Sequence, residues 1–139
     1  MKFHKDGPSS APEPGSRVIF VFGSNLAGIH GGGAARAASE KYGALWGKKG
    51  AIGLHGESYA IPTKGIDKHG SIGDSLGLQE INKYVNQFLN SATRMWADEF
   101  YVTRIGCVLA GYDDADIAPM FRGAPENCSF AEEWRQYLE

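Results

Sequence analysis

Hydrophobic residues fall into short apolar runs that alternate with segments of helical spacing. The run 17–22 is continuous, which is typical of a strand buried on both faces of a parallel sheet. Similar β-rich runs follow at 58–62 and 99–105. The segment 74–91 carries one apolar stripe and is predicted as the longest helix. The stripe consists of Leu78, Ile81, Val85, Phe88, Leu89 and Ala92.

Three further segments are predicted as helices. Small residues favour a helix at 33–42, the acidic residues from Asp113 open a short helix, and 129–138 begins with a capping-box pattern. Because strands alternate with helices, the chain from 17 to 139 is expected to be a single α/β domain with a mainly parallel sheet covered on both faces. The segments without clear periodicity are predicted as a flexible leader at 1–16, a hairpin or an irregular lobe at 43–57, and a flexible connection at 63–73.

Composition narrows the function classes. Of the 139 residues, 42% are hydrophobic and 22% are charged, as in an ordinary globular domain. A net charge of −2 gives no bulk attraction to nucleic acid or to an anionic membrane, and no apolar run approaches the ~18 residues of a membrane span. Cys107 and Cys128 form no CxxC motif, which favours a reducing cytoplasm, although one disulfide stays open. Scattered histidines predict neither a metal site nor a cofactor.

Glycine is concentrated where a ligand would need it. Ten of the 19 glycines lie between Gly23 and Gly56, and the stretch FGSNLAGIHGGGAA joins the first predicted strand to the first predicted helix. Glycines let main-chain N–H groups approach a ligand, and the helix behind them offers its positive end. An anion, most simply a phosphate, is therefore predicted at this stretch. The simpler interpretation of 31–33 is a tight loop without a ligand.

Other residues near the predicted strand ends allow both a structural and a functional interpretation. Asn25 is either a turn residue or a ligand contact, and Lys64 is either a solvated lysine or part of the site. Arg104 is interpreted as structural and held by a carboxylate. Cys107 is interpreted as a small buried residue, because no histidine nearby in the sequence could activate it.

The segments GSN…GGGAA, YAIPTK and TRIGCVLAGY together resemble the macro domain, an ADP-ribose-binding module. The resemblance runs from about Val18 to Phe121 and is nearest to the branch that includes the terminal ADP-ribose protein glycohydrolases. It implies a three-layer α/β/α domain with a small, mainly parallel sheet, and ADP-ribose or a related nucleotide as the ligand.

The resemblance also implies roles for individual positions. Asn25 would lie near the distal ribose, 31–34 would wrap the distal ribose and the diphosphate, and 106–111 would form a second phosphate loop. Lys64 would match the lysine that attacks the anomeric carbon of the ribose. The expected ligand-binding residues are Gly23, Ser24, Asn25, Gly31, Gly32, Gly33, Ala34, Thr63, Gly106, Cys107, Val108, Leu109, Ala110, Gly111 and Tyr112.

Several departures from the family pattern bear on chemistry. The catalytic aspartate of the family falls at Ala110, so that only Asp113 or Asp114 could replace it, and Val108 stands where the loop usually has a glycine. Neither the strand that carries the adenine-binding aspartate nor the usual last strand is recognised in the sequence, so a smaller sheet is expected.

Three hypotheses for the function follow. In the first, the protein binds ADP-ribose or a related nucleotide diphosphate and has weak glycohydrolase activity, with an ADP-ribosylated protein as its partner. The second is a non-catalytic reader or nucleotide-sequestering protein. The third is a protein-interaction scaffold with an empty cleft.

Overall fold

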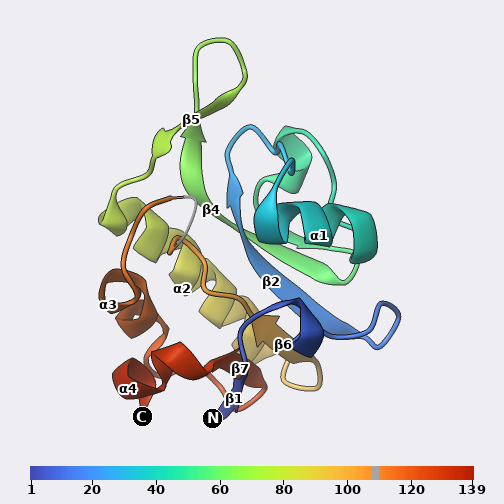
Figure 1. The fold of residues 1–139 in the computed structure, drawn as a ribbon, viewed down its shortest axis with the longest axis vertical. Coiled ribbons are helices and arrows are strands. Elements are labelled where there is room, and N and C mark those ends of the chain that lie inside the picture. Colours follow the sequence, from blue (N-terminus) through green and yellow to red (C-terminus); the bar gives the residue numbers. More distant parts are fainter. Residues whose placement is uncertain (108–109) are drawn as a thin grey trace.

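The computed structural model describes residues 1–107 and 110–139, and within them one seven-stranded sheet forms the centre of the domain (Figure 1). The strand order is β1-β7-β6-β2-β4-β3, and β5 pairs with β4. The strands are β1 (Lys2–His4), β2 (Val18–Asn25), β3 (Gly53–His55), β4 (Ser58–Ile66), β5 (Ile72–Ser75), β6 (Glu99–Val102) and β7 (Cys128–Ala131). The α-helices are α1 (Gly33–Lys41), α2 (Leu78–Arg94), α3 (Asp114–Ile117) and α4 (Arg135–Leu138). Short 3₁₀ turns cover Pro8–Ser10, Lys48–Gly50, Ala118–Phe121 and Glu132–Trp134.

The sheet is mainly parallel and has helices on both faces. The pairs β1–β7, β7–β6, β6–β2 and β2–β4 are parallel, whereas β3 and β5 pair with β4 in the antiparallel sense. Residues of β2 alternate between two cores: Val21 packs with Phe88 of α2, and Phe22 packs with Ala38 of α1. This alternation explains the continuous apolar run and confirms the expected three-layer α/β/α architecture, with a macro-like arrangement.

The connection 63–73, expected to be flexible, is instead built into the sheet. β4 continues to Ile66, and β5 returns antiparallel to it, with Lys64 opposite Ser75. The Asp67 carboxylate closes the turn, since one of its oxygens accepts hydrogen bonds from the N–H groups of His69 and Ser71, at 2.8 and 2.9 Å. The expectation failed because this aspartate-based turn was not recognised in the polar stretch.

The C-terminal helix predicted at 129–138 was also wrong in its first half. Cys128–Ala131 forms β7, which lies parallel between β6 and β1. Phe130 and Ala131 are fully buried there, so burial in the sheet outweighs the local capping-box signal. The chain therefore has the last strand that the sequence analysis did not recognise. A helical segment starts only at Glu132.

The N-terminal segment differs from the expected flexible leader because it lies against the domain. β1 pairs in parallel with β7, and the ring of His4 stacks on that of Tyr101 with centroids 3.8 Å apart. Further along, the hydroxyl of Tyr42 donates to the Pro12 carbonyl at 2.6 Å, and the Glu57 carboxylate accepts from the N–H groups of Gly15 and Arg17. The segment thereby forms part of the wall of the cavity described next.

Candidate functional site

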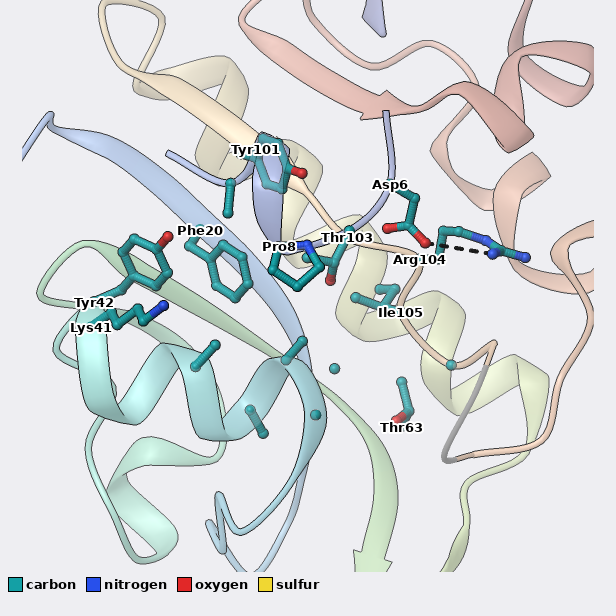
Figure 2. Close-up of a pocket in the computed structure, with 18 of the residues that line it drawn as sticks. Asp6, Pro8, Phe20, Lys41, Tyr42, Thr63, Tyr101, Thr103, Arg104 and Ile105 are labelled. Carbon is teal, nitrogen blue, oxygen red and sulfur yellow. Dashed lines mark ion pairs between the residues drawn. The ribbon is translucent and has the colours of Figure 1, made fainter. Parts of the chain in front are cut away.

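A cavity of about 470 Å³ lies on the α1 side of the sheet and extends to the carboxyl ends of β2, β4 and β6 (Figure 2). Gly23 of β2, Thr63 of β4 and Gly106 after β6 line one part of it, and α1 and the N-terminal segment close the other. In α/β sheets the carboxyl ends of the strands are the usual place for a ligand. A cavity of this volume is large enough for a small organic ligand.

The amino end of α1 opens onto the cavity. Gly33, Ala34 and Ala35 line the wall, and Gly32 is the N-cap residue. Within the described residues, no side chain caps the helix start, and the first intrahelical bond runs from Arg36 N–H to Gly32 O at 3.2 Å. The N–H groups of 33–35 are therefore free of intrahelical partners, as at every helix start, and the positive end of the helix dipole adds to their attraction for an anion.

Gly31 and Gly32 are glycines that the unliganded fold does not require. A Cβ atom at either position would meet nothing within 4 Å, and neither residue has a left-handed φ. Gly28 is different, because its φ is +68° and a Cβ there would lie 1.7 Å from Gly47 O. Gly28 is thus explained by packing, whereas the glycines at 31 and 32 leave open space beside the helix start.

Asn25 holds the glycine loop through its side chain. Its Nδ2 donates to Ile29 O at 2.8 Å, and its Oδ1 accepts from Ile29 N–H at 3.1 Å. Ser24 is similarly engaged, since its Oγ donates to Ala51 O. Both side chains are buried and are used within the protein, so of the residues expected in the first loop, Gly23, Gly33 and Ala34 are those that line the cavity.

The second predicted loop contributes Gly106 and Ala110 to the cavity wall. Gly106 has a φ of +77°, which favours glycine, and Tyr112 N–H donates to its carbonyl at 2.9 Å. Ser75 Oγ donates to Ala110 O at 2.7 Å, and the Tyr112 hydroxyl donates to Leu76 O, so the loop is tied to the segment between β5 and α2. Gly111 and Tyr112 are not among the lining residues. The expected contacts Val108 and Leu109 lie outside the described residues.

None of the three proposed catalytic residues lines the cavity. Lys64 follows Thr63 on β4 and is half-buried, but it does not line the cavity. Asp113 is the N-cap of α3, and its N–H donates to the Asp116 carboxylate. Asp114 accepts two hydrogen bonds from Arg104, at 3.0 and 2.6 Å, as the structural interpretation of that arginine predicted.

Electrostatics around Asp114 and Cys107 disfavours both as reactive groups. Burial alone would raise the pKa of Asp114, but hydrogen bonds from Arg104, Trp134 and Cys107 hold it below the usual value. Asp114 is therefore an ionised carboxylate whose oxygens already accept hydrogen bonds, and it is not suited to act as a general acid. Partial burial raises the pKa of the Cys107 thiol to about 12, so it stays protonated at neutral pH; the residue is half-buried and not fully buried as the sequence analysis expected.

Several cavity residues were missed by the sequence analysis. Phe20, Tyr42 and Tyr101 contribute aromatic rings, and Asp6 and Lys41 contribute charge. Burial raises the pKa of Tyr101 to about 12, so its hydroxyl remains a hydrogen-bond donor at neutral pH. The alternation within the predicted strands could have placed the rings of 20 and 101 on one face. Nothing in the sequence pointed to Asp6, which follows β1 and lies 3.6 Å from Arg104.

Comparisons with known proteins identify solved structures of similar fold. No protein-family model matches the sequence, and no curated protein matches it. Thermosipho africanus DarTG, solved in complex with ADP-ribose, matches with a TM-score of 0.56 and 14% identity over 84% of this chain. This chain covers only 38% of that DarTG chain.

Two Bacteroides thetaiotaomicron structures are similar as well. One, described as a protein of unknown function, has a TM-score of 0.53 and 17% identity, with 85% of this chain and 89% of that chain covered. The other, a structural-genomics target, has a TM-score of 0.61 and 13% identity, with 94% and 99% covered. At these identities the likeness shows the fold alone. Within the described residues, no helix combines the length and apolar character needed to cross a membrane.

Proposed function

We propose that the protein binds ADP-ribose or a related nucleotide diphosphate in the cavity beside α1. The observation that carries the proposal is the uncapped amino end of α1, whose residues Gly33, Ala34 and Ala35 line the cavity. Main-chain N–H groups at a helix start, approached through glycine, form a site that suits an anion such as a phosphate. A diphosphate placed there would account for the two glycines that the unliganded fold leaves unexplained.

Two further facts support a nucleotide as the ligand. The cavity is larger than a diphosphate needs and adds aromatic rings to the anion site. The DarTG structure of similar fold was solved with ADP-ribose. The corresponding partner is an ADP-ribosylated protein. The two free cysteines, Cys107 and Cys128, are consistent with a reducing cytoplasm as the compartment.

Hydrolysis is proposed to be weak or absent. A nucleophilic lysine and an acid for the leaving group must reach the same atom. Lys64 does not line the cavity, Asp114 is held by Arg104, and Ala110 offers no acid at the position that the family resemblance assigns to one. The arrangement therefore favours binding without efficient turnover.

Titration calorimetry with ADP-ribose, ADP and NAD tests the proposal, with adenosine as the control that lacks phosphate. We expect micromolar affinity for at least one diphosphate and none for adenosine. In thermal unfolding, ligand at about 100 times Kd should add about 2.7 kcal/mol of stability. The proposal fails if none of the three diphosphates binds or shifts the unfolding temperature at millimolar concentration.

A further inference from the structure

The lobe 43–57, which connects α1 to β4, exposes four large apolar side chains (Figure 1). Leu45, Trp46, Ile52 and Leu54 are between 39% and 58% exposed. Single exposed apolar side chains are ordinary, whereas four within ten residues are typical of an interaction surface. The other exposed large apolar side chains in the described part of the chain lie far from one another in the sequence, namely Met1, Ile72 and Trp96.

The lobe is held in one conformation by contacts that leave these side chains exposed. The carbonyl of Leu45 accepts a hydrogen bond from His30 Nε2 at 2.6 Å, and Trp46 Nε1 donates to Ser39 Oγ of α1 at 2.7 Å. The lobe is also compact, since a Cβ built at Gly50 would lie 1.6 Å from Leu45 O. A partner would therefore meet a surface that is already ordered, which lowers the entropic cost of binding.

β3 (Gly53–His55), inside this lobe, is the last strand on its side of the sheet. It pairs with β4 only, and no other strand of the described residues lies along its outer side. Leu54 lies opposite Tyr59, which belongs to the core under α2, whereas Trp46 contacts α1 on the other face. A strand added beside β3 would point alternate side chains to these two faces, and its main chain could pair with the free edge. The surface therefore fits an extended polypeptide.

The charge of the lobe indicates what kind of polypeptide fits. Lys48 and Lys49 are exposed, and neither forms an ion pair with any residue that the structure describes. The only acidic residue of 43–57 is Glu57, whose carboxylate already accepts from the N–H groups of Gly15 and Arg17. The lobe is thus basic in a chain of net charge −2. A second copy bound through the same edge would bring two basic lobes together, so an acidic partner is favoured.

We propose that the lobe binds an extended acidic segment of another protein, which adds to the sheet as a strand beside β3. Its apolar residues would contact Leu54 and Trp46, and its carboxylates would pair with Lys48 and Lys49. This interaction goes beyond the proposed binding of ADP-ribose and does not depend on it, because no residue of 43–57 lines the cavity.

Selection from a display library of random peptides, about twelve residues long, tests the proposal, followed by calorimetry on the enriched peptides. We expect these peptides to alternate apolar residues with Asp or Glu. Leu54→Glu should raise their Kd by about tenfold or more, and Lys49→Glu should raise it several-fold and weaken its dependence on salt. The matched controls are Trp96→Glu and Lys83→Glu, which change an exposed side chain of the same type elsewhere and should leave Kd unchanged.

Amide hydrogen exchange on the wild type reads the pairing directly, since a bound peptide should slow exchange at 53–55. The proposal is overturned if no peptide is enriched, if the enriched peptides bind folded Leu54→Glu as tightly as the wild type, or if exchange at 53–55 is unaffected. A wild-type dimer that Leu54→Glu dissociates would assign the edge to a second copy instead. Tighter binding of a single-stranded oligonucleotide than of any peptide, lost in Lys49→Glu, would assign the lysines to nucleic acid. Either result also overturns the proposal, and the proposed binding of ADP-ribose is tested separately.

Discussion

Replacing Gly32 by valine separates ligand binding from folding, because the unliganded structure does not need a glycine there. Gly32 has φ −154° and ψ 165°, an extended conformation that valine adopts readily, and a Cβ would meet nothing within 4 Å. As an N-cap, valine is less stabilising than glycine by up to about 1 kcal/mol. Valine also lowers the conformational entropy of the unfolded chain, which stabilises the folded state by roughly 0.4–1 kcal/mol. The free energy of unfolding should therefore change by less than about 1 kcal/mol, a Tm shift of only a few degrees.

The effect on binding should be much larger. The N–H groups of 33–35 can donate to a phosphate, and each hydrogen bond to a charged group contributes roughly 1.5–3 kcal/mol. If the valine side chain denies the phosphate two of these bonds, binding weakens by at least about 3 kcal/mol, which is more than about 100-fold in Kd. Calorimetry with ADP-ribose measures this loss, and thermal unfolding without ligand measures the stability of the variant.

Gly77→Val is the matched control. Gly77 is the N-cap of α2, it has no side-chain cap, and a Cβ there would also meet open space, but no residue of α2 lines the cavity, whereas Gly33, Ala34 and Ala35 of α1 do. Gly77→Val should lose about as much stability at the helix start as Gly32→Val does, and it should bind ADP-ribose with the affinity of the wild type. Equal ADP-ribose affinity in wild type and folded Gly32→Val would refute the placement of the phosphate at the start of α1.

Three more variants give testable outcomes. Asp114→Asn should lower the free energy of unfolding by about 1–3 kcal/mol at neutral pH, since it weakens a part-buried charged pair with Arg104. The depressed pKa of Asp114 contributes stability above the ordinary carboxyl pKa that is lost as the pH falls through the folded value, so acid unfolding followed by circular dichroism should be less steep in Asp114→Asn. Lys64→Ala should leave ADP-ribose affinity unchanged, because Lys64 does not line the cavity. Both the wild type and Lys64→Ala should release ADP-ribose from a mono-ADP-ribosylated protein at a rate near background. Turnover in the wild type that is lost in Lys64→Ala would contradict this expectation. Tyr42→Phe, which removes the hydrogen bond to Pro12 O, should cost about 1 kcal/mol in thermal unfolding, and an unchanged Tm would show that this bond does not hold the segment.

The central part of the fold could be predicted because its signals are local and agree with one another. Residues 18–22 of the run 17–22 lie in β2, where 19–22 are buried and face both sides of the sheet. Ile81, Val85 and Phe88 of the predicted stripe are buried on α2, which begins at Leu78. Small residues after the glycine loop form α1. Strand and helix periodicity depend on nearest neighbours along the chain, so the sequence alone is enough to indicate these elements.

The two edges of the domain could not be predicted because they depend on partners distant in sequence. Lys2–His4 has too few residues to signal a strand and is ordered by pairing with Ser129–Ala131. The segment 128–131 carries a helix-start pattern, yet full burial of Phe130 between β6 and β1 decides its conformation. Since the N-terminal segment also forms a wall of the cavity, part of the candidate site was invisible in the sequence for the same reason.

Binding and catalysis place different demands on this fold. An anion site made of main-chain N–H groups at a helix start depends on the position of the backbone, which α1 and β2 fix whatever their side chains are. A nucleophile and its acid depend instead on two particular side chains that reach one point. Neither Lys64 nor Asp114 lines the cavity, and Asp114 is bound by Arg104. The fold is similar to that of structures only 13–17% identical in sequence, so backbone geometry persists while most side chains differ. The proposed anion site therefore does not depend on residues for hydrolysis, and Ala110 and the Arg104–Asp114 pair occupy the places where the family resemblance led us to expect such residues.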